Sequence, residues 1–287
     1  MAIIVGRLPA NFAGRDIIIG DLHGHPEILH RLLAQAKFNP ARDRVISTGD
    51  LVDRGPDSLG CLEFLNEPWF FAVRGNHEQN LAAMIAMAAT ALDRGQSVSD
   101  IISDLSETVA RMSAGWFPQW LASGTFDRNH MDAIYTRIMS LPHILAVGDG
   151  RQRFNVVHAD VIEAGLASDQ QIDAAHGMQD SIREQALIWS RTAYRCLQEG
   201  YDAPDIERQL SLTFCGHNAT SLLMVWGRHM FIDTGCGYLA SPDLGLSAVV
   251  VPTGDVLFEP MPTVIWGLEY RTQKRMLIGD QIERIYP

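Results

Sequence analysis

Asp16-Ile-Ile-Ile-Gly-Asp-Leu-His-Gly24 opens the part of the chain whose pattern decides the fold. Three consecutive isoleucines are typical of a strand buried on both faces, and the polar residues after them mark its end. A helical pattern over 26–36 follows, with a proline in its first turn. The alternation continues with strands expected at 44–48 and 69–73 and helices over 58–65 and from about 78 to 92. The order βαβαβα predicts an α/β protein with a largely parallel sheet and helices on its faces.

The rest of the chain adds a helical segment and then more strands. Residues 93–140 have a looser helical pattern with several large aromatic side chains. Further strands are expected at 153–157, 210–214, 229–232, 246–251 and 256–258. Because no Pro-, Gly- or Ser-rich linker divides the sequence, we predict one domain over 1–287 with a helical insertion at approximately 93–140.

Composition excludes several classes of protein. The chain has 287 residues, of which 47% are hydrophobic and 20% charged, and this balance is typical of a folded globular protein. The formal net charge of −11 argues against a protein that coats nucleic acid or binds an anionic membrane surface. It also means that any phosphate site needs strong local positive charge.

The sequence further predicts a cytoplasmic protein with no membrane segment. The first fifteen residues contain only a short apolar run, Ala2 to Val5, which is too short for the core of a signal peptide. The longest apolar stretch, Leu81 to Leu92, is shorter than the about 20 residues that a membrane span needs. The four cysteines are widely spaced and form no CxxC pair, which favours free thiols in a reducing compartment.

Polar clusters follow five of the expected strands. They are Gly20-Asp-Leu-His-Gly24, Gly49-Asp-Leu-Val-Asp-Arg-Gly55, Arg74-Gly-Asn-His-Glu78, Val157-His-Ala-Asp160 and Cys215-Gly-His-Asn218. Ligands of α/β sheets bind at the carboxyl ends of strands, so these clusters are expected to converge on one place. Taken singly, a histidine beside a strand is more often a hydrogen-bonded or exposed side chain, but five such clusters in this order favour a shared site.

The clusters contain the ligand types of a divalent metal site. The candidate ligands are Asp21, His23, Asp50, Asn76, His158 and His217. Carboxylate, amide and imidazole ligands suit Mn, Fe or Zn, and six of them exceed what one tetrahedral ion needs. Two ions about 3.5–4 Å apart that share a carboxylate would use all six.

Together, GDLHG, GDLVDRG, RGNHE and the later HAD and GH resemble the calcineurin-like metallophosphoesterases. Within that family they resemble the phosphoprotein phosphatase branch, and most of all the lambda-type serine/threonine phosphatases of bacteria and phages. Ile188-Trp-Ser-Arg191 and Phe231-Ile-Asp-Thr-Gly235 fit the same pattern. The resemblance implies a β-sandwich of mixed sheets flanked by helices, a phosphoprotein or phosphopeptide substrate, and two divalent ions, most often Mn²⁺, with Fe or Zn as alternatives.

The resemblance also implies the roles of the site residues. Asp21 and His23 would hold the first ion, Asp50 would bridge, and the remaining three ligands would complete the second ion. A metal-bridging hydroxide would attack phosphorus directly. His77, oriented by Asp53, would protonate the leaving alkoxide as general acid.

Three arginines are candidates for binding the phosphate. Arg54 follows Asp53 and offers a planar fork for two phosphate oxygens. Arg191 matches a later substrate arginine of the family, and its alternative is a surface charge on a helix. Arg74 either binds phosphate or braces its own loop.

Two other functions compete with that of a protein phosphatase. A symmetrical diadenosine-tetraphosphate hydrolase shares much of the motif set, although the sequence has no extra basic cluster for a longer polyphosphate. A non-catalytic phosphoprotein-binding relative would be marked by the loss of a ligand or of the Asp53–His77 pair, and all of these residues are present.

Overall fold

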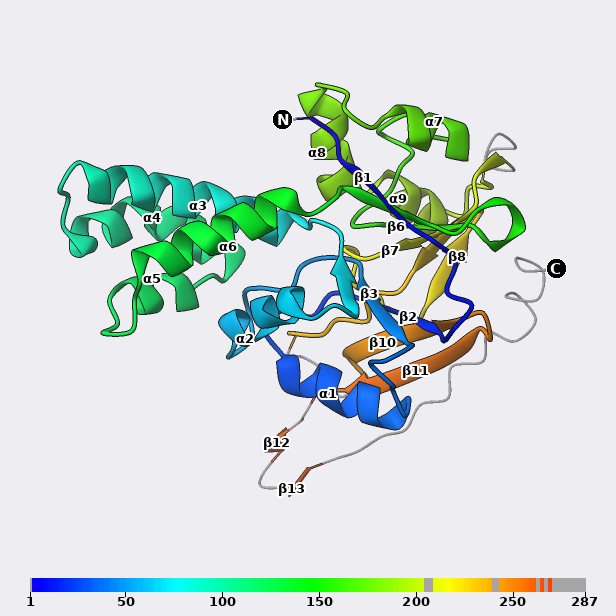
Figure 1. Cartoon of the computed structure of the whole chain (residues 1–287), viewed down its shortest axis with the longest axis horizontal. Coiled ribbons are helices and arrows are strands. Elements are labelled where there is room, and N and C mark those ends of the chain that lie inside the picture. The colour runs from blue at the N-terminus through cyan, green and yellow to red at the C-terminus, as the bar shows by residue number, and fades with distance from the viewer. Residues whose placement is uncertain (1, 204–208, 239–242, 262–263, 266–267, 270–287) are drawn as a thin grey trace.

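A computed structural model describes residues 2–203, 209–238, 243–261, 264–265 and 268–269, and in it two β-sheets lie face to face between helices (Figure 1). The first sheet has the strand order β11-β10-β2-β3-β4. Its strands are β2 (Asp16–Ile19), β3 (Arg44–Ser47), β4 (Phe70–Ala72), β10 (Gly245–Val251) and β11 (Asp255–Pro260). Strands β2, β3 and β4 are parallel, whereas β10 runs antiparallel to both of its neighbours. The predicted βαβαβα order is confirmed.

The second sheet is also mixed and has the strand order β1-β5-β6-β7-β9-β8. Its strands are β1 (Val5–Leu8), β5 (Ile144–Val147), β6 (Phe154–Val157), β7 (Leu212–Cys215), β8 (Met224–Trp226) and β9 (His229–Phe231). Its central strands β6, β7 and β9 are parallel. A separate pair, β12 (Val264–Ile265) and β13 (Leu268–Glu269), is antiparallel. The predicted sandwich of two mixed sheets is therefore confirmed.

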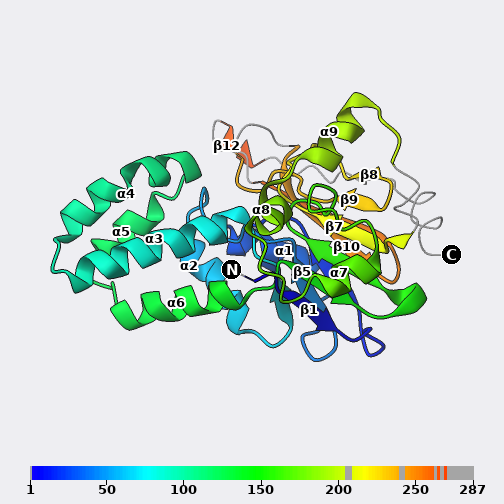
Figure 2. The ribbon, with the colours of Figure 1, turned by 90° about the horizontal axis from the view of Figure 1, so that it is seen from above.

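Helices cover the outer faces of the two sheets and form a projecting arm. The helices are α1 (Pro26–Gln35), α2 (Ser58–Glu63), α3 (Asn76–Asp93), α4 (Val98–Met112), α5 (Trp116–Leu121), α6 (Arg128–Ser140), α7 (Asp169–Ala174), α8 (Ser181–Trp189) and α9 (Thr192–Glu199), with 3₁₀ turns at Phe64–Asn66 and Gly150–Gln152. Helices α3 to α6 extend to one side of the sheets in both ribbon views (Figures 1 and 2). We call these four helices the helical arm.

The alternation of side chains along β2 builds two layers of the core. Ile18 packs between the sheets with Ile46 and with Phe214 of the second sheet. Ile17 and Ile19 lie on the other face of the strand, in the cluster that includes helix α1 and the arm. Because successive side chains of a strand point to opposite faces, the isoleucine run contributes to both layers. Full burial of such a side chain stabilises the fold by about 1.5–3 kcal/mol.

Helix α3 begins earlier than the sequence pattern predicts. We expected its start near Glu78, but the helix begins at Asn76. Gly75 is the extended N-cap residue, and the Glu78 carboxylate accepts its backbone N–H at 2.9 Å. This capping arrangement lets the helix begin directly after the loop. Asn76 and His77 therefore lie in the first helical turn, at the base of the arm.

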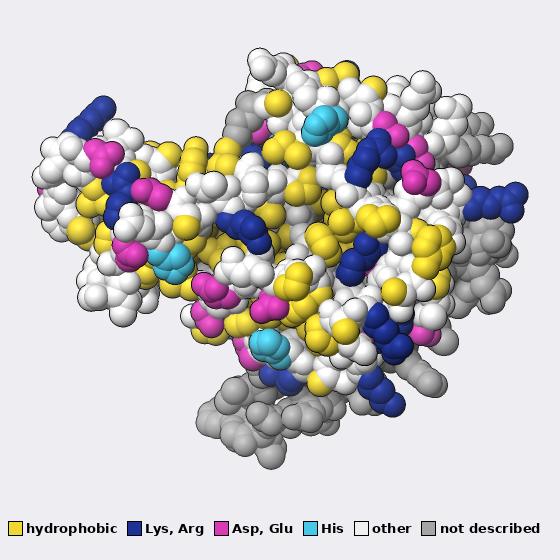
Figure 3. Space-filling model, viewed as in Figure 1, with side chains coloured by type: hydrophobic (Ala, Val, Ile, Leu, Met, Phe, Trp, Pro, Cys, Tyr) yellow, Lys and Arg dark blue, Asp and Glu magenta, His cyan; other side chains and the backbone are white. Residues whose placement is uncertain are grey.

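Three further observations concern the surface charges, the cysteines and the length of the helices. On the face drawn in Figure 3, acidic and basic side chains are interspersed and do not gather in one patch of a single sign. The four cysteines are free thiols, and three of them are buried. Within the described residues, no helix combines the length and the apolar character that a membrane crossing requires.

Candidate metal centre

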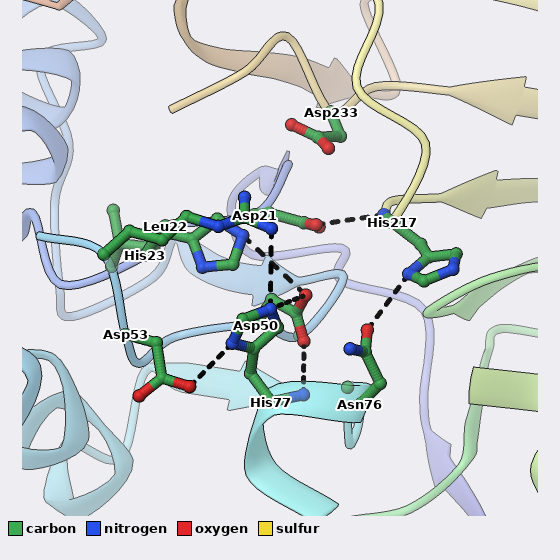
Figure 4. Close-up of polar contacts among 12 residues, drawn as sticks. Asp21, Leu22, His23, Asp50, Asp53, Asn76, His77, His217 and Asp233 are labelled. Carbon is green, nitrogen blue, oxygen red and sulfur yellow. Dashed lines mark hydrogen bonds and ion pairs between the residues drawn. The ribbon is translucent and has the colours of Figure 1, made fainter. Parts of the chain in front are cut away.

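The structure brings the predicted strand-end clusters to one place, at the carboxyl ends of strands from both sheets (Figure 4). The first sheet supplies the loops after β2, β3 and β4, and the second supplies those after β6 and β7. These loops carry the six predicted metal ligands, Asp21, His23, Asp50, Asn76, His158 and His217. All six are buried: His217 is 8% exposed and the other five are at most 4% exposed.

The backbone of these loops adopts unusual conformations. Asp50 has a φ of 48°, His23 of 43° and His217 of 63°, all in the left-handed region. Non-glycine residues rarely occupy this region, and such residues cluster at functional sites. Gly49, with a φ of 99°, is required for a further reason: a Cβ there would lie 2.8 Å from the backbone nitrogen of Gly75. The loops after β3 and β4 therefore touch.

Two of the histidines are held as neutral rings that direct a lone pair into the site. Nδ1 of His23 lies 3.0 Å from the carbonyl oxygen of Val52, and Nδ1 of His158 lies 2.8 Å from that of Thr48. A carbonyl oxygen only accepts hydrogen bonds, so Nδ1 carries the proton in both rings. The Nε2 lone pair of His158 then faces the Asn76 Oδ1 atom at 2.9 Å. Acceptors that face one another in this way are suited to a cation.

Asp50 lies at the centre of the cluster. Its Oδ2 is 3.8 Å from Nε2 of His23 and of His77, and its Oδ1 is 3.4 Å from Nε2 of His158. Two groups of side chains have ligand atoms within 4.8 Å of one another: His23, Asp50 and His77, and Asp50, His158 and His217. Asp50 is common to both groups. This position is compatible with the bridging role predicted for Asp50, which stays a prediction.

The charge and bonding of the site also fit bound cations. Nε2 of His23 and of His217 is buried without a hydrogen-bond partner. Burial and the nearby carboxylates of Asp233 and Asp50 raise the pKa of Asp21 well above its ordinary value. An accumulation of buried carboxylates with unpartnered imidazole nitrogens is unfavourable unless positive charge is present. The donor set therefore fits divalent metal ions.

Asp21 faces a different direction from the other carboxylates. Its Oδ1 accepts the Thr48 hydroxyl, and its Oδ2 accepts the backbone N–H of His217, each at 3.0 Å. Figure 4 shows it reaching toward His217. Its oxygens belong to neither of the two ligand groups above. Its predicted role as a ligand stays a prediction.

Asp233 is a residue of the site that the sequence reasoning missed. It is 1% exposed and follows β9, and burial is the main cause that raises its pKa to about 6. It lies beside the cluster in Figure 4. The same rule that identified the other clusters, a polar residue directly after an expected strand, would have found it in Phe231-Ile-Asp-Thr-Gly235.

His77 differs from the other histidines in its partner. Its Nδ1 lies 2.7 Å from Oδ2 of the Asp53 carboxylate, not from a carbonyl oxygen. Burial acts to lower the pKa of His77, but Asp50 and Asp53 outweigh it and raise the pKa above the ordinary value. Burial lowers the pKa of His23 and His158. A carboxylate partner favours the imidazolium, which is the form that donates a proton.

The side chain of Glu78 holds the loops of the site together. Its Oε2 accepts the backbone N–H of Asp50 at 2.8 Å, and its Oε1 accepts that of Leu51 at 2.7 Å. It also caps α3 through Gly75, as described above. Three donors from two loops thus share one carboxylate. Burial, followed by the charge of Asp50, raises its pKa to about 7.

Two of the predicted phosphate-binding arginines lie beside the cluster. The Arg54 guanidinium is 3.5 Å from Nε2 of His77 and stacks over the ring of Tyr238, 4.3 Å from its centroid. Arg191 is the N-cap residue of α9, and its Nη1 donates to Oδ1 of Asn218 at 2.7 Å. Tyr238 was not singled out from the sequence, because nothing in the chain near it marks a contact with Arg54.

The placement of Arg74 favours the bracing alternative. This fully buried side chain donates to the carbonyl oxygens of Met139 at 2.6 Å and Leu141 at 3.1 Å, and to Oε1 of Gln79 at 3.2 Å. These contacts direct its guanidinium toward the end of α6. Arg74 therefore ties the loop after β4 to the helical arm.

A sandwich of two mixed sheets, with buried His and Asp groups suited to metal ions at its strand ends, defines a metal-dependent phosphoesterase. Residues 15–220 match the calcineurin-like phosphoesterases. The chain belongs to this family.

Individual relatives agree with this assignment. The chain is 31% identical over 219 residues to serine/threonine-protein phosphatase 1 of Salmonella typhimurium, a match that covers 76% of this chain and 85% of the relative. It is 47% identical over 70 residues to a symmetrical bis(5'-nucleosyl)-tetraphosphatase of Actinobacillus pleuropneumoniae, which covers 24% and 26%. A solved structure of a candidate diadenosine tetraphosphatase matches the fold with a TM-score of 0.55 at 22% identity, over 90% of this chain and 98% of that one.

Proposed function

We propose that the protein is a metal-dependent serine/threonine protein phosphatase that hydrolyses phosphomonoesters. One observation carries the proposal: the Asp53–His77 pair, joined at 2.7 Å, borders a cluster of ligand atoms centred on Asp50. A proton donor beside a site for cations is what the hydrolysis of an alkyl phosphate needs. The relative named serine/threonine-protein phosphatase 1 supports the choice of substrate class.

The proposal assigns the metal ligands as follows. Asp21 and His23 would hold one ion, Asp50 would be shared, and Asn76, His158 and His217 would hold the other. A pair of divalent ions, Mn²⁺ in the first instance, would supply positive charge for the phosphate and acidify a water molecule for in-line attack on phosphorus. We further propose that 1–287 is one catalytic domain in a reducing, cytoplasmic setting, where the free thiols would persist.

The chain's own residues would then bind the phosphate and handle the proton. Arg54 and Arg191 would each hold phosphate oxygens, because a guanidinium matches two oxygens at once. His77 would donate its Nε2 proton to the serine or threonine alkoxide as the P–O bond breaks. Asp53 would keep the proton on Nδ1 and stabilise the imidazolium before donation.

A groove beside the cluster supports a peptide substrate. It has a volume of about 820 Å³ and is lined by side chains that include Asn80, Arg111 and Ile182. Asn80 donates to the Asn76 carbonyl at 2.6 Å, so the groove adjoins the ligand cluster. On its other side Trp189 packs edge-on against His217, with ring centroids 6.2 Å apart. Residues that flank a phosphoserine could lie along this groove.

A second candidate is the hydrolysis of dinucleoside polyphosphates. The 47% identity to a symmetrical bis(5'-nucleosyl)-tetraphosphatase favours it, although that match covers only 70 residues. The mechanism of attack would be the same. The two functions differ in what lies beyond the reacting phosphate, a peptide or a second nucleotide.

A substrate comparison after metal removal tests the proposal. The protein is treated with a chelator, and Mn²⁺, Zn²⁺, Fe²⁺ and Mg²⁺ are added back separately, each with a phosphoserine peptide and with diadenosine tetraphosphate. We expect chelation to abolish turnover and Mn²⁺ to restore it best, with the peptide as the faster substrate. Faster turnover of the dinucleotide at equal concentration would select the second candidate. Turnover that survives complete chelation would overturn both.

A further inference from the structure

The helical arm reaches the Asp53–His77 pair through one hydrogen bond. Trp116, the first residue of α5, donates its indole Nε1–H to Oδ1 of Asp53 at 2.7 Å. The other oxygen of this fully buried carboxylate, Oδ2, is bonded to His77 at 2.7 Å. One carboxylate thus connects the arm to His77 through its two oxygens.

The arm also holds the backbone of the same loop. The backbone N–H of Arg54 donates to the Ser113 carbonyl at 3.1 Å, and Ser113 is the left-handed residue that ends α4. Asp53 and Arg54 have φ values of 72° and 65°, a conformation that needs support from its surroundings. The turn between α4 and α5 therefore contacts both the side chain and the backbone of the loop after β3.

We propose that Trp116 is a positioning residue for the Asp53–His77 pair, through which the helical arm takes part in catalysis. This rests on the proposed function, because it assigns the arm a role in orienting the general acid. If the indole donor were absent, Oδ1 would be a buried carboxylate oxygen without its partner, and the carboxylate could rotate or admit water. His77 would then lose part of its fixed orientation.

The alternative is that Trp116 only packs the arm. Its ring lies 5.8 Å from that of Phe117 and 6.4 Å from that of Trp120, so it does contribute to packing. The two roles can be separated, because Trp116→Phe keeps an aromatic ring and removes the N–H. Trp120→Phe is the matched control, since Trp120 is in the same helix and its ring contacts lie within the arm.

The test compares kcat and KM on two substrates, an alkyl phosphate such as a phosphoserine peptide and p-nitrophenyl phosphate. Removing the outer hydrogen-bond partner of a metal-bound histidine typically costs about 10- to 100-fold in metal affinity or activity, and we take the same scale for the outer partner of the Asp53–His77 pair. We expect Trp116→Phe to lower kcat on the peptide by that factor with little change in KM. The loss on p-nitrophenyl phosphate should be much smaller, because its leaving group needs little protonation. Trp120→Phe should leave both rates near those of the unmodified protein.

A third variant addresses the case in which Trp116→Phe folds poorly. Trp116→His fills the space less well but keeps a ring that donates a hydrogen bond. In Trp116→His, the ratio of kcat on the peptide to kcat on p-nitrophenyl phosphate should stay closer to that of the unmodified protein than it does in Trp116→Phe. A second readout, independent of turnover, is the low-field proton NMR signal of the His77 Nδ1–H, which we expect to move in Trp116→Phe and to stay in Trp120→Phe.

The outcomes separate this inference from the proposed function. Equal losses on both substrates, equal effects of the two phenylalanine variants, or an unmoved His77 signal would overturn the role of Trp116. If His77→Asn lost equal activity on both substrates, the assignment of His77 as the general acid would be wrong, and the inference about Trp116 would lose its basis. If His77→Asn lost far more activity on the peptide than on p-nitrophenyl phosphate but Trp116→Phe did not, the inference about Trp116 would be overturned and the proposed function would stand.

Discussion

At the scale of single residues, the hydrogen-bond partner of Nδ1 separates the histidines of the site. His23 and His158 donate from Nδ1 to backbone carbonyl oxygens, which favours a neutral ring with a free Nε2 lone pair. His77 is bonded to the Asp53 carboxylate. The motif RGNHE places a candidate metal ligand and a candidate acid side by side, because Asn76 and His77 leave the first turn of α3 in different directions (Figure 4).

Replacing His77 tests its assignment as the general acid. We expect His77→Asn to reduce kcat on alkyl phosphates by about 10²–10⁴-fold, the usual contribution of a positioned acid. The reduction on p-nitrophenyl phosphate should be much smaller. His130→Asn is the control, because His130 is a half-exposed histidine of the arm. Equal reductions on both substrates would remove His77 from this role.

Replacing Arg54 tests phosphate binding separately from metal binding. Arg54→Ala should weaken inhibition by inorganic phosphate by about 10-fold or more, the scale of a lost hydrogen bond between charged groups. The metal content should stay unchanged, since the guanidinium contacts His77 and Tyr238 and none of the six residues proposed as metal ligands. Arg151→Ala, at an exposed site in another part of the fold, is the control. Loss of metal from Arg54→Ala would show that Arg54 supports the structure of the site instead.

At the scale of elements, the strands and helices of the first half were predictable, whereas β1, β5 and β8 of the second sheet were missed. The isoleucines of β2 and the helical period of α1 indicated both elements directly. Strand β1 was missed, because Val5-Gly-Arg-Leu8 has a glycine and an arginine inside it and no apolar run. Strand β8 has only three residues. Such strands form because a neighbouring strand pairs with them, and this tertiary effect leaves little trace in local sequence.

One helix offers a test of how its start is stabilised. The Asp180 carboxylate caps α8 by accepting the backbone N–H of Ile182 and of Arg183, each at 3.1 Å. We expect Asp180→Ala to lower the free energy of unfolding by about 1 kcal/mol, measured by denaturant titration. Asp180→Asn should keep most of this stability, because asparagine also caps helices and the surface ion pair between Asp180 and Arg183 contributes little. A full loss in Asp180→Asn would mean that the ion pair matters more than the cap.

At the scale of the whole molecule, the site lies where two sheets meet. The loops after β2, β3 and β4 belong to one sheet and those after β6, β7 and β9 to the other. The sequence indicated polar residues at the strand ends of five of these loops and missed Asp233 in the loop after β9. No local pattern says which face of one sheet packs on the other. The approach of Trp116 to Asp53, 63 residues apart, was unpredictable for the same reason.

The position of the N-terminal strand leads to a prediction about pH and stability. His143 is fully buried, and its Nδ1 accepts the backbone N–H of Ile4 at 3.0 Å, which only an unprotonated nitrogen can do. Burial, followed by the charge of Arg74, lowers its pKa from 6.5 to about 4. Between pH 4 and pH 6.5, His143 is therefore protonated in the unfolded chain and neutral in the folded one. The stability that neutral His143 contributes is therefore complete above pH 6.5 and is lost as the pH falls toward 4.

Measuring the free energy of unfolding from pH 7 to pH 4 tests whether stability falls with pH in this way. The unmodified protein should lose on the order of 2 kcal/mol more than His143→Gln over that range, because the variant keeps the neighbouring Glu184 but lacks the imidazole that takes up a proton. The glutamine keeps a side-chain acceptor near Ile4. Identical pH dependence of the two proteins would show that His143 does not carry the effect.

The presence of two metal ions that share Asp50 is the claim on which the proposed chemistry depends. The most direct measurement is elemental analysis of the active protein, combined with anomalous diffraction from its crystals at the absorption edge of the metal that is found. We expect two ions per chain, both within bonding distance of the Asp50 carboxylate. One ion or none in fully active protein, with Asp50 directed away from it, would contradict the account.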